Sequence, residues 1–173
     1  MIQFVKKQLK GSLVGAEAGV YAGDNAVNIL SSIPNVKRLY LIDPYKTDYW
    51  VWKTSFLKTL PKAKQTAFRQ LTRFKERVIW IYEEFEASLI PEPLDFIYID
   101  GCHSYESVKH DIREAEEIVK HGGVIGGHDY YPNGVNEHRF GVGCAVREHY
   151  GHRLRHRETD WWVVYESPDV NRY

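Results

Sequence analysis

A strand–helix–strand pattern in the second half of the chain constrains the fold most strongly. The apolar run Leu94–Ile99 ends at Asp100, and in the next segment, Tyr105–Lys120, apolar residues recur at the spacing of one helix face. Gly122 and Gly123 provide a helix end, and a glycine-rich apolar run continues to Gly127. Two strands joined through a helix run parallel, so this pattern predicts a parallel sheet covered by helices.

The same alternation of strand and helix extends along the rest of the chain. Further strand candidates are Ser12–Glu17, Arg38–Ile42 and Arg77–Tyr82, and further helix candidates are Asp24–Ser32, residues 53–76, Glu83–Leu89 and Val142–Tyr150. His152–Arg157 and Trp161–Tyr165 flank a short turn, which favours an antiparallel hairpin. We therefore predict one α/β domain over residues 1–173, a three-layer sandwich with a mostly parallel seven-stranded sheet that ends in this hairpin.

The composition indicates an ordinary folded protein whose net charge creates no strong electrostatic field. The chain has 43% hydrophobic and 27% charged residues, which excludes disorder. Lys plus Arg and Asp plus Glu number 23 each, so nothing in the net charge attracts nucleic acid or a membrane. A basic stretch, residues 149–157, fits a solvated edge strand or a contact with an anionic partner. Two cysteines, no membrane-length apolar run and no signal-peptide core lead us to expect a cytoplasmic location.

Polar residues stand at the ends of four predicted strands. They are Glu17, Asp43, Asp100 and the pair His128-Asp129. Ligands of open parallel sheets bind beyond the carboxyl ends of the strands, where the strand order reverses. We therefore expect the functional site at this edge of the sheet.

The turn after the first strand carries the glycines of a candidate ligand loop, Glu17-Ala-Gly19-Val-Tyr-Ala-Gly23. Without a Cβ, Gly19 would let a ligand approach the backbone, although an ordinary tight turn gives the same pattern. The spacing differs from the Gly-x-Gly-x-x-Gly of pyrophosphate sites, which disfavours a nicotinamide dehydrogenase. It suits a phosphate-free nucleoside with an amino-acid tail. Asp43 could bind ribose hydroxyls or cap a helix.

Four blocks of sequence resemble the class I S-adenosylmethionine-dependent methyltransferases. They are Glu17-x-Gly19-x-x-x-Gly23, Leu-Tyr-Leu-Ile-Asp43-Pro44-Tyr45, Ile99-Asp100-Gly101-Cys-His103-Ser-Tyr105, and Gly122-Gly123-Val-Ile-Gly-Gly-His128-Asp129. More narrowly, they are similar to the small-domain family of macrocin and cephalosporin-pathway O-methyltransferases. The resemblance covers residues 14–150 and implies the Rossmann-like methyltransferase sandwich.

By this resemblance, S-adenosylmethionine binds along the same edge. The loop Glu17–Gly23 would hold the methionine part and Asp43 the ribose, and the segment Tyr82–Phe85 would border the adenine. The cofactor-binding residues that the resemblance implies are Glu17, Gly19, Val20, Tyr21, Gly23, Asp43, Pro44, Glu83, Asp100 and Gly101.

Two predicted strands that should be neighbours in the sheet are each followed by polar candidates for the chemistry. These candidates are Asp100, His103, His128 and Asp129. One interpretation is a divalent metal, Mg²⁺ or another ion, held by Asp100, His128 and Asp129, which would orient the acceptor hydroxyl and lower its pKa. The other makes His103 or His128 the general base, oriented by Asp100 or Asp129. Both stay open, and we take His103, His128 and Asp129 as the catalytic candidates. A third interpretation treats these residues as caps and loop polars.

The acceptor side is less constrained. Only about 11 residues precede the first strand, so the aromatic loops Tyr45–Trp52 and Tyr130–Phe140 must line the acceptor pocket or form an interface between subunits of a homo-oligomer. We expect methyl transfer to a hydroxyl of a small molecule, with no membrane and no nucleic-acid partner. The alternatives are a non-catalytic cofactor-binding or scaffold protein and an RNA methyltransferase.

Overall fold

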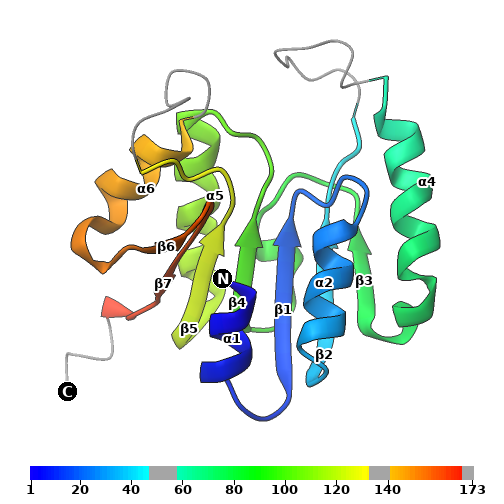
Figure 1. Cartoon of the computed structure of the whole chain (residues 1–173), viewed down its shortest axis with the longest axis horizontal. Coiled ribbons are helices and arrows are strands. Elements are labelled where there is room, and N and C mark those ends of the chain that lie inside the picture. Colours follow the sequence, from blue (N-terminus) through cyan, green and yellow to red (C-terminus); the bar gives the residue numbers. More distant parts are fainter. Residues whose placement is uncertain (47–57, 133–140, 169–173) are drawn as a thin grey trace.

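In the computed structural model, which describes residues 1–46, 58–132 and 141–168, seven strands form one sheet (Figure 1). Their order across the sheet is β3-β2-β1-β4-β5-β7-β6. The strands are β1 (Leu13–Ala18), β2 (Val36–Ile42), β3 (Val78–Ile81), β4 (Leu94–Ile99), β5 (Val119–Gly127), β6 (Arg155–Arg157) and β7 (Asp160–Val164).

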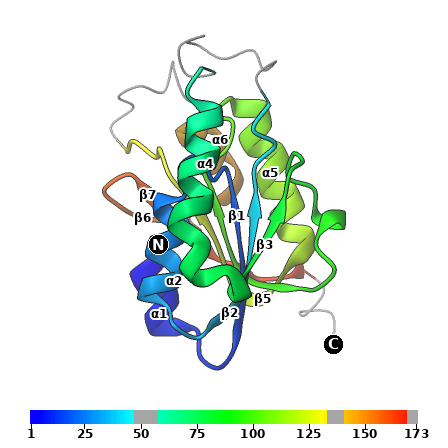
Figure 2. The same cartoon turned by 90° about the vertical axis from the view of Figure 1, so that its right-hand side faces the viewer.

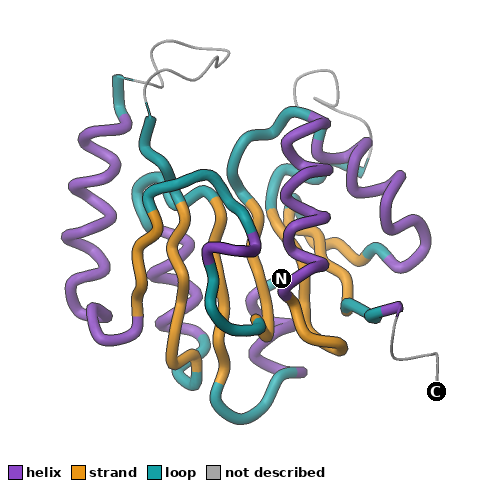
Figure 3. Tube along the Cα trace, turned by 180° about the vertical axis from the view of Figure 1, so that it is seen from behind, coloured by secondary structure: helices purple, strands orange, loops and turns teal. Residues whose placement is uncertain are grey.

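The first five strands are parallel, and the last two form the predicted hairpin. β1 pairs with β2 on one side and with β4 on the other, and β7 runs antiparallel to both β5 and β6. The strand order therefore reverses between β1 and β4, and the predicted fold is confirmed. The carboxyl ends of the parallel strands share one edge, where their loops gather (Figure 3).

Helices cover both faces of the sheet (Figure 2). On one face, α1 (Ile2–Gln8), α2 (Asp24–Ser32) and α4 (Leu60–Leu71) contribute to one apolar core with residues such as Leu39 and Phe96. On the other face, α5 (Tyr105–Ile118) and α6 (Val142–Tyr150) contribute to a second core with residues such as Ile97 and Ile125. Alternate residues of the central strands therefore pack into two separate cores, one on each face of the sheet.

Two predicted elements differ from the structure. The segment Glu83–Leu89 is not a helix, because Phe85 is buried while the flanking glutamates are exposed, and only a 3₁₀ turn, η2 (Ala87–Leu89), forms. The first residues of the helix predicted over residues 53–76 lie outside the described residues. Its described part is α4 followed by the 3₁₀ segment η1 (Thr72–Arg77).

The strand boundaries near the hairpin also shift. β5 starts earlier than predicted, at Val119, directly after α5. β6 is short because a 3₁₀ turn, η3 (Gly151–Arg153), takes up the start of the predicted strand. Among the helices of the described residues, none combines the length and apolarity that a membrane span requires.

Candidate active site

Gly19 brings two loops of the carboxyl edge into backbone contact. It has a φ of +87°, and a Cβ built on it would lie only 2.1 Å from the carbonyl oxygen of Asp100. The sequence suggested that this glycine admits a ligand, but the described residues give it a different reason: the turn after β1 packs against the backbone after β4. Gly23, with φ +84°, is the N-cap of α2, and a Cβ built on it would lie 3.1 Å from the Cα of Ala67 on α4.

Glu17 is a buried carboxyl with one oxygen unpartnered. It lies within β1 and is 1% exposed. Asn25 on α2 donates to Oε1 at 3.1 Å, and Oε2 has no hydrogen-bond partner among the described residues. Burial, opposed by the Asn25 bond and reinforced by the charges of Asp100, Asp43 and Asp24, raises the pKa of Glu17 to about 8. A cation or hydrogen-bond donor at Oε2 would relieve this cost.

Asp43 holds the loop after β1 in place. Its Oδ2 accepts hydrogen bonds from the backbone N–H groups of Val20 at 3.0 Å and Tyr21 at 2.8 Å, and its Oδ1 accepts from Tyr45 N–H at 2.8 Å. The Tyr45 hydroxyl donates to the carbonyl oxygen of Tyr21 at 2.7 Å. The ribose contact of Asp43 stays a prediction. The structure adds a role that the sequence did not suggest: the hydrogen bonds of Asp43 fix the backbone of the turn after β1, which contains Gly19 and Gly23.

The segment after β3 borders an open groove of about 430 Å³. Glu83 is exposed there, and its carboxylate lies 3.8 Å from Lys46 Nζ. The groove is lined by Lys46, Glu83, Glu84, Glu86 and Leu89. The predicted adenine contact of Glu83 is untested. Most of the aromatic loops Tyr45–Trp52 and Tyr130–Phe140 lies outside the described residues.

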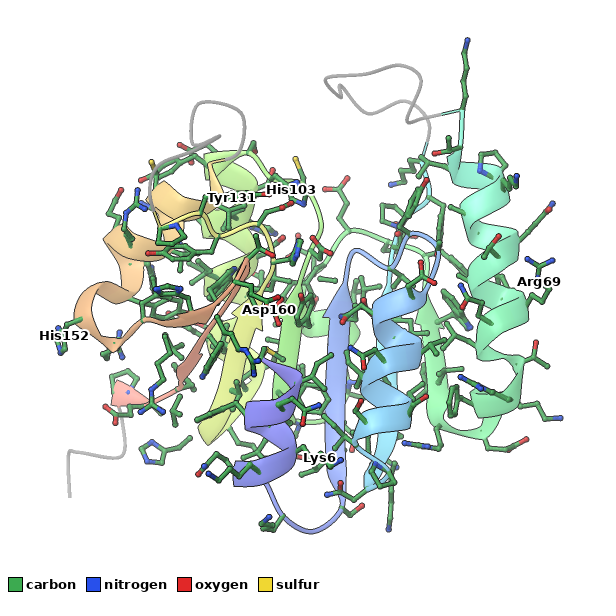
Figure 4. The ribbon with its side chains drawn as sticks, viewed as in Figure 1. Lys6, Arg69, His103, Tyr131, His152 and Asp160 are labelled. Atoms are coloured by element: carbon green, nitrogen blue, oxygen red, sulfur yellow. The ribbon has the colours of Figure 1, made fainter. Side chains whose placement is uncertain are left out.

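His103 lies between two carboxylates at the ends of β4 and β5. Its Nε2 is 3.3 Å from Asp100 Oδ1, and its Nδ1 is 3.1 Å from Asp129 Oδ2. Burial of the ring opposes its charged form, but the hydrogen bond to Asp100 and the charges of Asp129 and Asp100 prevail and raise the pKa of His103. His103 stands at the carboxyl edge of the sheet with Tyr131 nearby (Figure 4).

His128 contacts the same aspartate from the opposite side. Its Nδ1 is 3.3 Å from Asp129 Oδ1, while its Nε2 is hydrogen-bonded to the Thr159 hydroxyl at 2.8 Å. The bond to Asp129 raises the pKa of His128 despite partial burial. Burial pushes the pKa of Asp129 upward, but His128 and His103 outweigh it, so the pKa is lowered. Asp129 therefore links two imidazoles.

Asp100, His103 and Asp129 each offer one ligand atom, and these atoms lie within 4.8 Å of one another. The metal set predicted from the sequence contained His128 in place of His103. His128 lies outside this group: its Nδ1 contacts Asp129 and its Nε2 is hydrogen-bonded to Thr159. The set with His128 stays a prediction.

Asp111 is a buried carboxyl that the sequence reasoning missed. It lies on α5, is 9% exposed, and has no hydrogen-bond partner among the described residues. Burial, partly offset by His110 and reinforced by Glu114, Glu84 and Glu86, raises its pKa to about 7. The available signal was its position between Val108, Ile112 and Ala115, because an acid on the apolar face of a helix is unusual.

The strand order, the terminal hairpin and the polar carboxyl edge define a Rossmann-like methyltransferase fold. A model of the family described as methyltransferase domain matches residues 16–130, so this chain belongs to that family. No curated protein matches the chain significantly in sequence. The narrower resemblance to the macrocin and cephalosporin-pathway enzymes stays a prediction.

Solved structures share this fold at low sequence identity. An rRNA methylase from Streptococcus thermophilus is 13% identical, with 96% of this chain and 93% of that chain covered and a TM-score of 0.62. The N-methyltransferase NodS from Bradyrhizobium japonicum WM9 is 15% identical, with coverages of 96% and 92% and a TM-score of 0.64. An O-methyltransferase from Bacillus cereus, in complex with S-adenosylhomocysteine, is 16% identical, with coverages of 95% and 78% and a TM-score of 0.60.

Proposed function

We propose that this chain transfers the methyl group of S-adenosylmethionine to a hydroxyl group of a small molecule. The observation that carries the proposal is the position of His103 between Asp100 and Asp129, at the ends of neighbouring strands. Membership of the methyltransferase-domain family and the S-adenosylhomocysteine bound to the Bacillus cereus O-methyltransferase support the choice of cofactor. The equal numbers of basic and acidic residues favour a small acceptor over nucleic acid.

The unpartnered oxygen of Glu17 fits the cofactor. S-adenosylmethionine carries an ammonium group, which is the kind of donor that a buried carboxyl with raised pKa lacks. We assign the methionine part to the loop Glu17–Gly23 and the ribose to the neighbourhood of Asp43 and Pro44. Gly101 and Asp100 would flank the cofactor from β4. When bound, the sulfonium supplies the reactive methyl group.

His103 and Asp129 are proposed to manage the proton of the reaction. The acceptor oxygen bonds to the methyl carbon as the carbon–sulfur bond breaks, and the hydroxyl must release its proton. In its neutral form His103 carries one N–H, which it donates to one of the two carboxylates, and its other ring nitrogen can take the proton of the acceptor. Asp100 and Asp129 then stabilise the resulting imidazolium, in line with the raised pKa of His103. His128, through Asp129, forms the second route for that proton.

A divalent metal is a second way to activate the same hydroxyl. Two carboxylates and one imidazole fit a divalent ion, and the nitrogen ligand suits a transition ion better than Mg²⁺. Such an ion would lower the pKa of a bound hydroxyl. Asp100, His103 and Asp129 would hold it, with His128 as the alternative imidazole.

Calorimetry with S-adenosylhomocysteine tests the cofactor half of the proposal. We expect binding in the micromolar range, and no heat at high micromolar ligand would reject it. For the reaction, a panel of sugars and phenols is incubated with labelled S-adenosylmethionine, with His103→Ala as the control. Product formed equally by wild type and by His103→Ala would reject the proposed role of His103. Turnover that survives EDTA and gains nothing from added Mn²⁺ would reject the metal.

A further inference from the structure

A second group of metal-ligating side chains lies away from the catalytic candidates, between α5 and the segment that follows β3. His110 and Glu114 are about one turn apart on α5, and Glu86 belongs to the segment after β3. Each offers one ligand atom, and these three atoms lie within 4.8 Å of one another. Within the part of the chain that the structure describes, the other group of this kind is the one at the ends of β4 and β5.

Two of the three ligand atoms are already at the separation that a tetrahedral metal site requires. His110 Nε2 lies 3.4 Å from Glu86 Oε1. Metal bonds of about 2.1 Å at the tetrahedral angle place neighbouring ligand atoms roughly 3.4 Å apart. The carbonyl oxygen of Phe85, 3.3 Å from the same nitrogen, is a further oxygen ligand within reach. An ion pair between Glu86 and a protonated imidazole has the same geometry, so metal binding has to be measured directly.

Glu114 is oriented by the segment that carries Glu86. Its Oε2 accepts a hydrogen bond from Ala87 N–H at 2.7 Å, and within the described residues its Oε1 has no hydrogen bond or ion pair. A carboxylate that binds a metal through one oxygen is commonly held in place by a hydrogen bond to the other. Phe85 is buried in the core to which α5 contributes, so packing fixes the backbone next to Glu86. The three ligands are therefore partly preorganised.

The surroundings of this group favour a cation. Glu86 lines the open groove of about 430 Å³ together with Glu83 and Glu84. Lys46 is the basic residue of the groove lining, and its Nζ lies 3.8 Å from the carboxylate of Glu83. The excess of carboxylates creates a negative potential that raises the local concentration of cations. Because His110 and Glu86 are each about half exposed, an ion from solvent reaches them without opening the fold.

We propose that Glu86, His110 and Glu114 bind a divalent transition-metal ion, for which Zn²⁺ is the best fit, and that this ion fastens the segment after β3 to α5. Two carboxylates and one imidazole suit zinc better than Mg²⁺ or Ca²⁺, which prefer oxygen ligands throughout. Three protein ligands leave a fourth position for water. The site is separate from the catalytic candidates and does not depend on the proposed methyl transfer.

Calorimetric titration with zinc chloride tests the site on wild type and four variants. His110→Gln and Glu114→Gln each remove one ligand, whereas His103→Gln disables the group at the ends of β4 and β5. The control is His152→Gln, which replaces an exposed histidine outside both groups. We expect wild type, His103→Gln and His152→Gln to share one zinc-binding event. His110→Gln and Glu114→Gln should weaken this event by at least about tenfold.

Three results of the titration would overturn the assignment. They are the absence of zinc binding to wild type, equal zinc affinity in His110→Gln and wild type, and loss of all binding in His103→Gln. None of them bears on methyl transfer, because binding of S-adenosylhomocysteine is measured separately and without zinc.

Amide hydrogen exchange tests whether the ion fastens the segment. Zinc should slow exchange over Glu83–Leu89 in wild type and in His103→Gln, and should leave it unchanged in His110→Gln. NMR of the histidine rings identifies the ligand, since zinc should shift the Nε2 resonance that is missing from the spectrum of His110→Gln. Because zinc stabilises the state that binds it, the unfolding temperature should rise in wild type and not in His110→Gln. Unchanged exchange over Glu83–Leu89 with zinc bound would overturn the fastening role.

Discussion

The carboxyl groups in the two halves of the carboxyl edge of the sheet have different hydrogen-bond partners and oppositely shifted pKa values. In the half formed by β1 and β2, and within the part of the chain that the structure describes, Glu17 leaves one oxygen unpartnered and Asp43 accepts hydrogen bonds from backbone N–H groups. In the half formed by β4 and β5, Asp100 and Asp129 both contact imidazoles. Accordingly the pKa of Glu17 is raised to about 8 and the pKa of Asp129 is lowered. The carboxyl of Glu17 in the first half lacks a donor on one oxygen, whereas the carboxylates of the second half are paired with imidazoles of the protein.

Replacing Glu17 should give the largest effect in this comparison. The folded-state pKa of about 8 lies above the unfolded value of 4.5, so the contribution of Glu17 is fully present below pH 4.5 and is lost as pH rises through 8. The loss amounts to at most about 5 kcal/mol. Urea unfolding between pH 5 and pH 9 without cofactor should show Glu17→Gln more stable than wild type at pH 9, with the difference vanishing toward pH 5. Parallel stability curves for the two proteins would mean that Glu17 is not held uncharged.

Gly19→Ala should disrupt the contact that joins the two halves. A Cβ 2.1 Å from the Asp100 carbonyl oxygen forces the loops apart, and the left-handed φ adds strain. We expect a loss of at least about 3 kcal/mol of unfolding free energy. Gly11→Ala is the matched control, since Gly11 has φ +76° and no atom within 4 Å of a built Cβ. Equal losses in both variants would assign the whole effect to backbone conformation.

Asp129→Asn should weaken the paired half. Without the carboxylate, the pKa of His103 should fall, which an NMR titration of the imidazole in the presence of EDTA can follow. The ion pair of Asp129 and His103 contributes to stability at pH values above the lowered pKa of Asp129. This contribution is lost as pH rises through the raised pKa of His103. Once an acceptor is known, the rate should drop by about a hundredfold or more. If the pKa of His103 is the same in Asp129→Asn and in wild type, the Asp129 carboxylate does not stabilise the charged imidazole.

The smallest effect concerns which histidine acts. Thr159→Val removes the hydroxyl that is hydrogen-bonded to His128 Nε2 at 2.8 Å and leaves His103 untouched. If His103 carries the proton, the rate should change by less than about tenfold, in line with the loss of roughly 1 kcal/mol for one hydrogen bond. A loss as large as that of Asp129→Asn would assign the proton to His128. Initial rates of S-adenosylhomocysteine release provide the measurement.

Much of the fold followed from local pattern. Apolar runs ending in Glu17, Asp43, Asp100 and His128-Asp129 located the carboxyl edge, because only the end of a buried strand changes so abruptly to polar residues. The helix predicted over Glu83–Leu89 was wrong because the helical composition of this segment competes with burial of Phe85, a tertiary effect. The start of β5 at Val119 depends on pairing with Leu94 of β4, and the extent of β6 depends on pairing with β7. Local sequence pattern contains neither contact.

The site was predictable as a set of residues but not as contacts. Ring orientation decided that His103, rather than His128, joins Asp100 and Asp129 in one group. The role of Gly19 depends on the backbone of Asp100, 81 positions away in the sequence. Asp111 was missed because the helix prediction over Tyr105–Lys120 rested on the apolar residues of one face and assigned no role to the acid between them.

The close approach of Gly19 to the Asp100 carbonyl oxygen couples the two halves mechanically. The loop assigned to the cofactor and the strand end that carries the proton-handling cluster have no side chain between them to absorb a displacement. If the loop shifts by a fraction of an ångström on binding, Asp100 has to follow, and His103 with it. Occupancy of one half would thus be transmitted to the geometry of the other through rigid backbone.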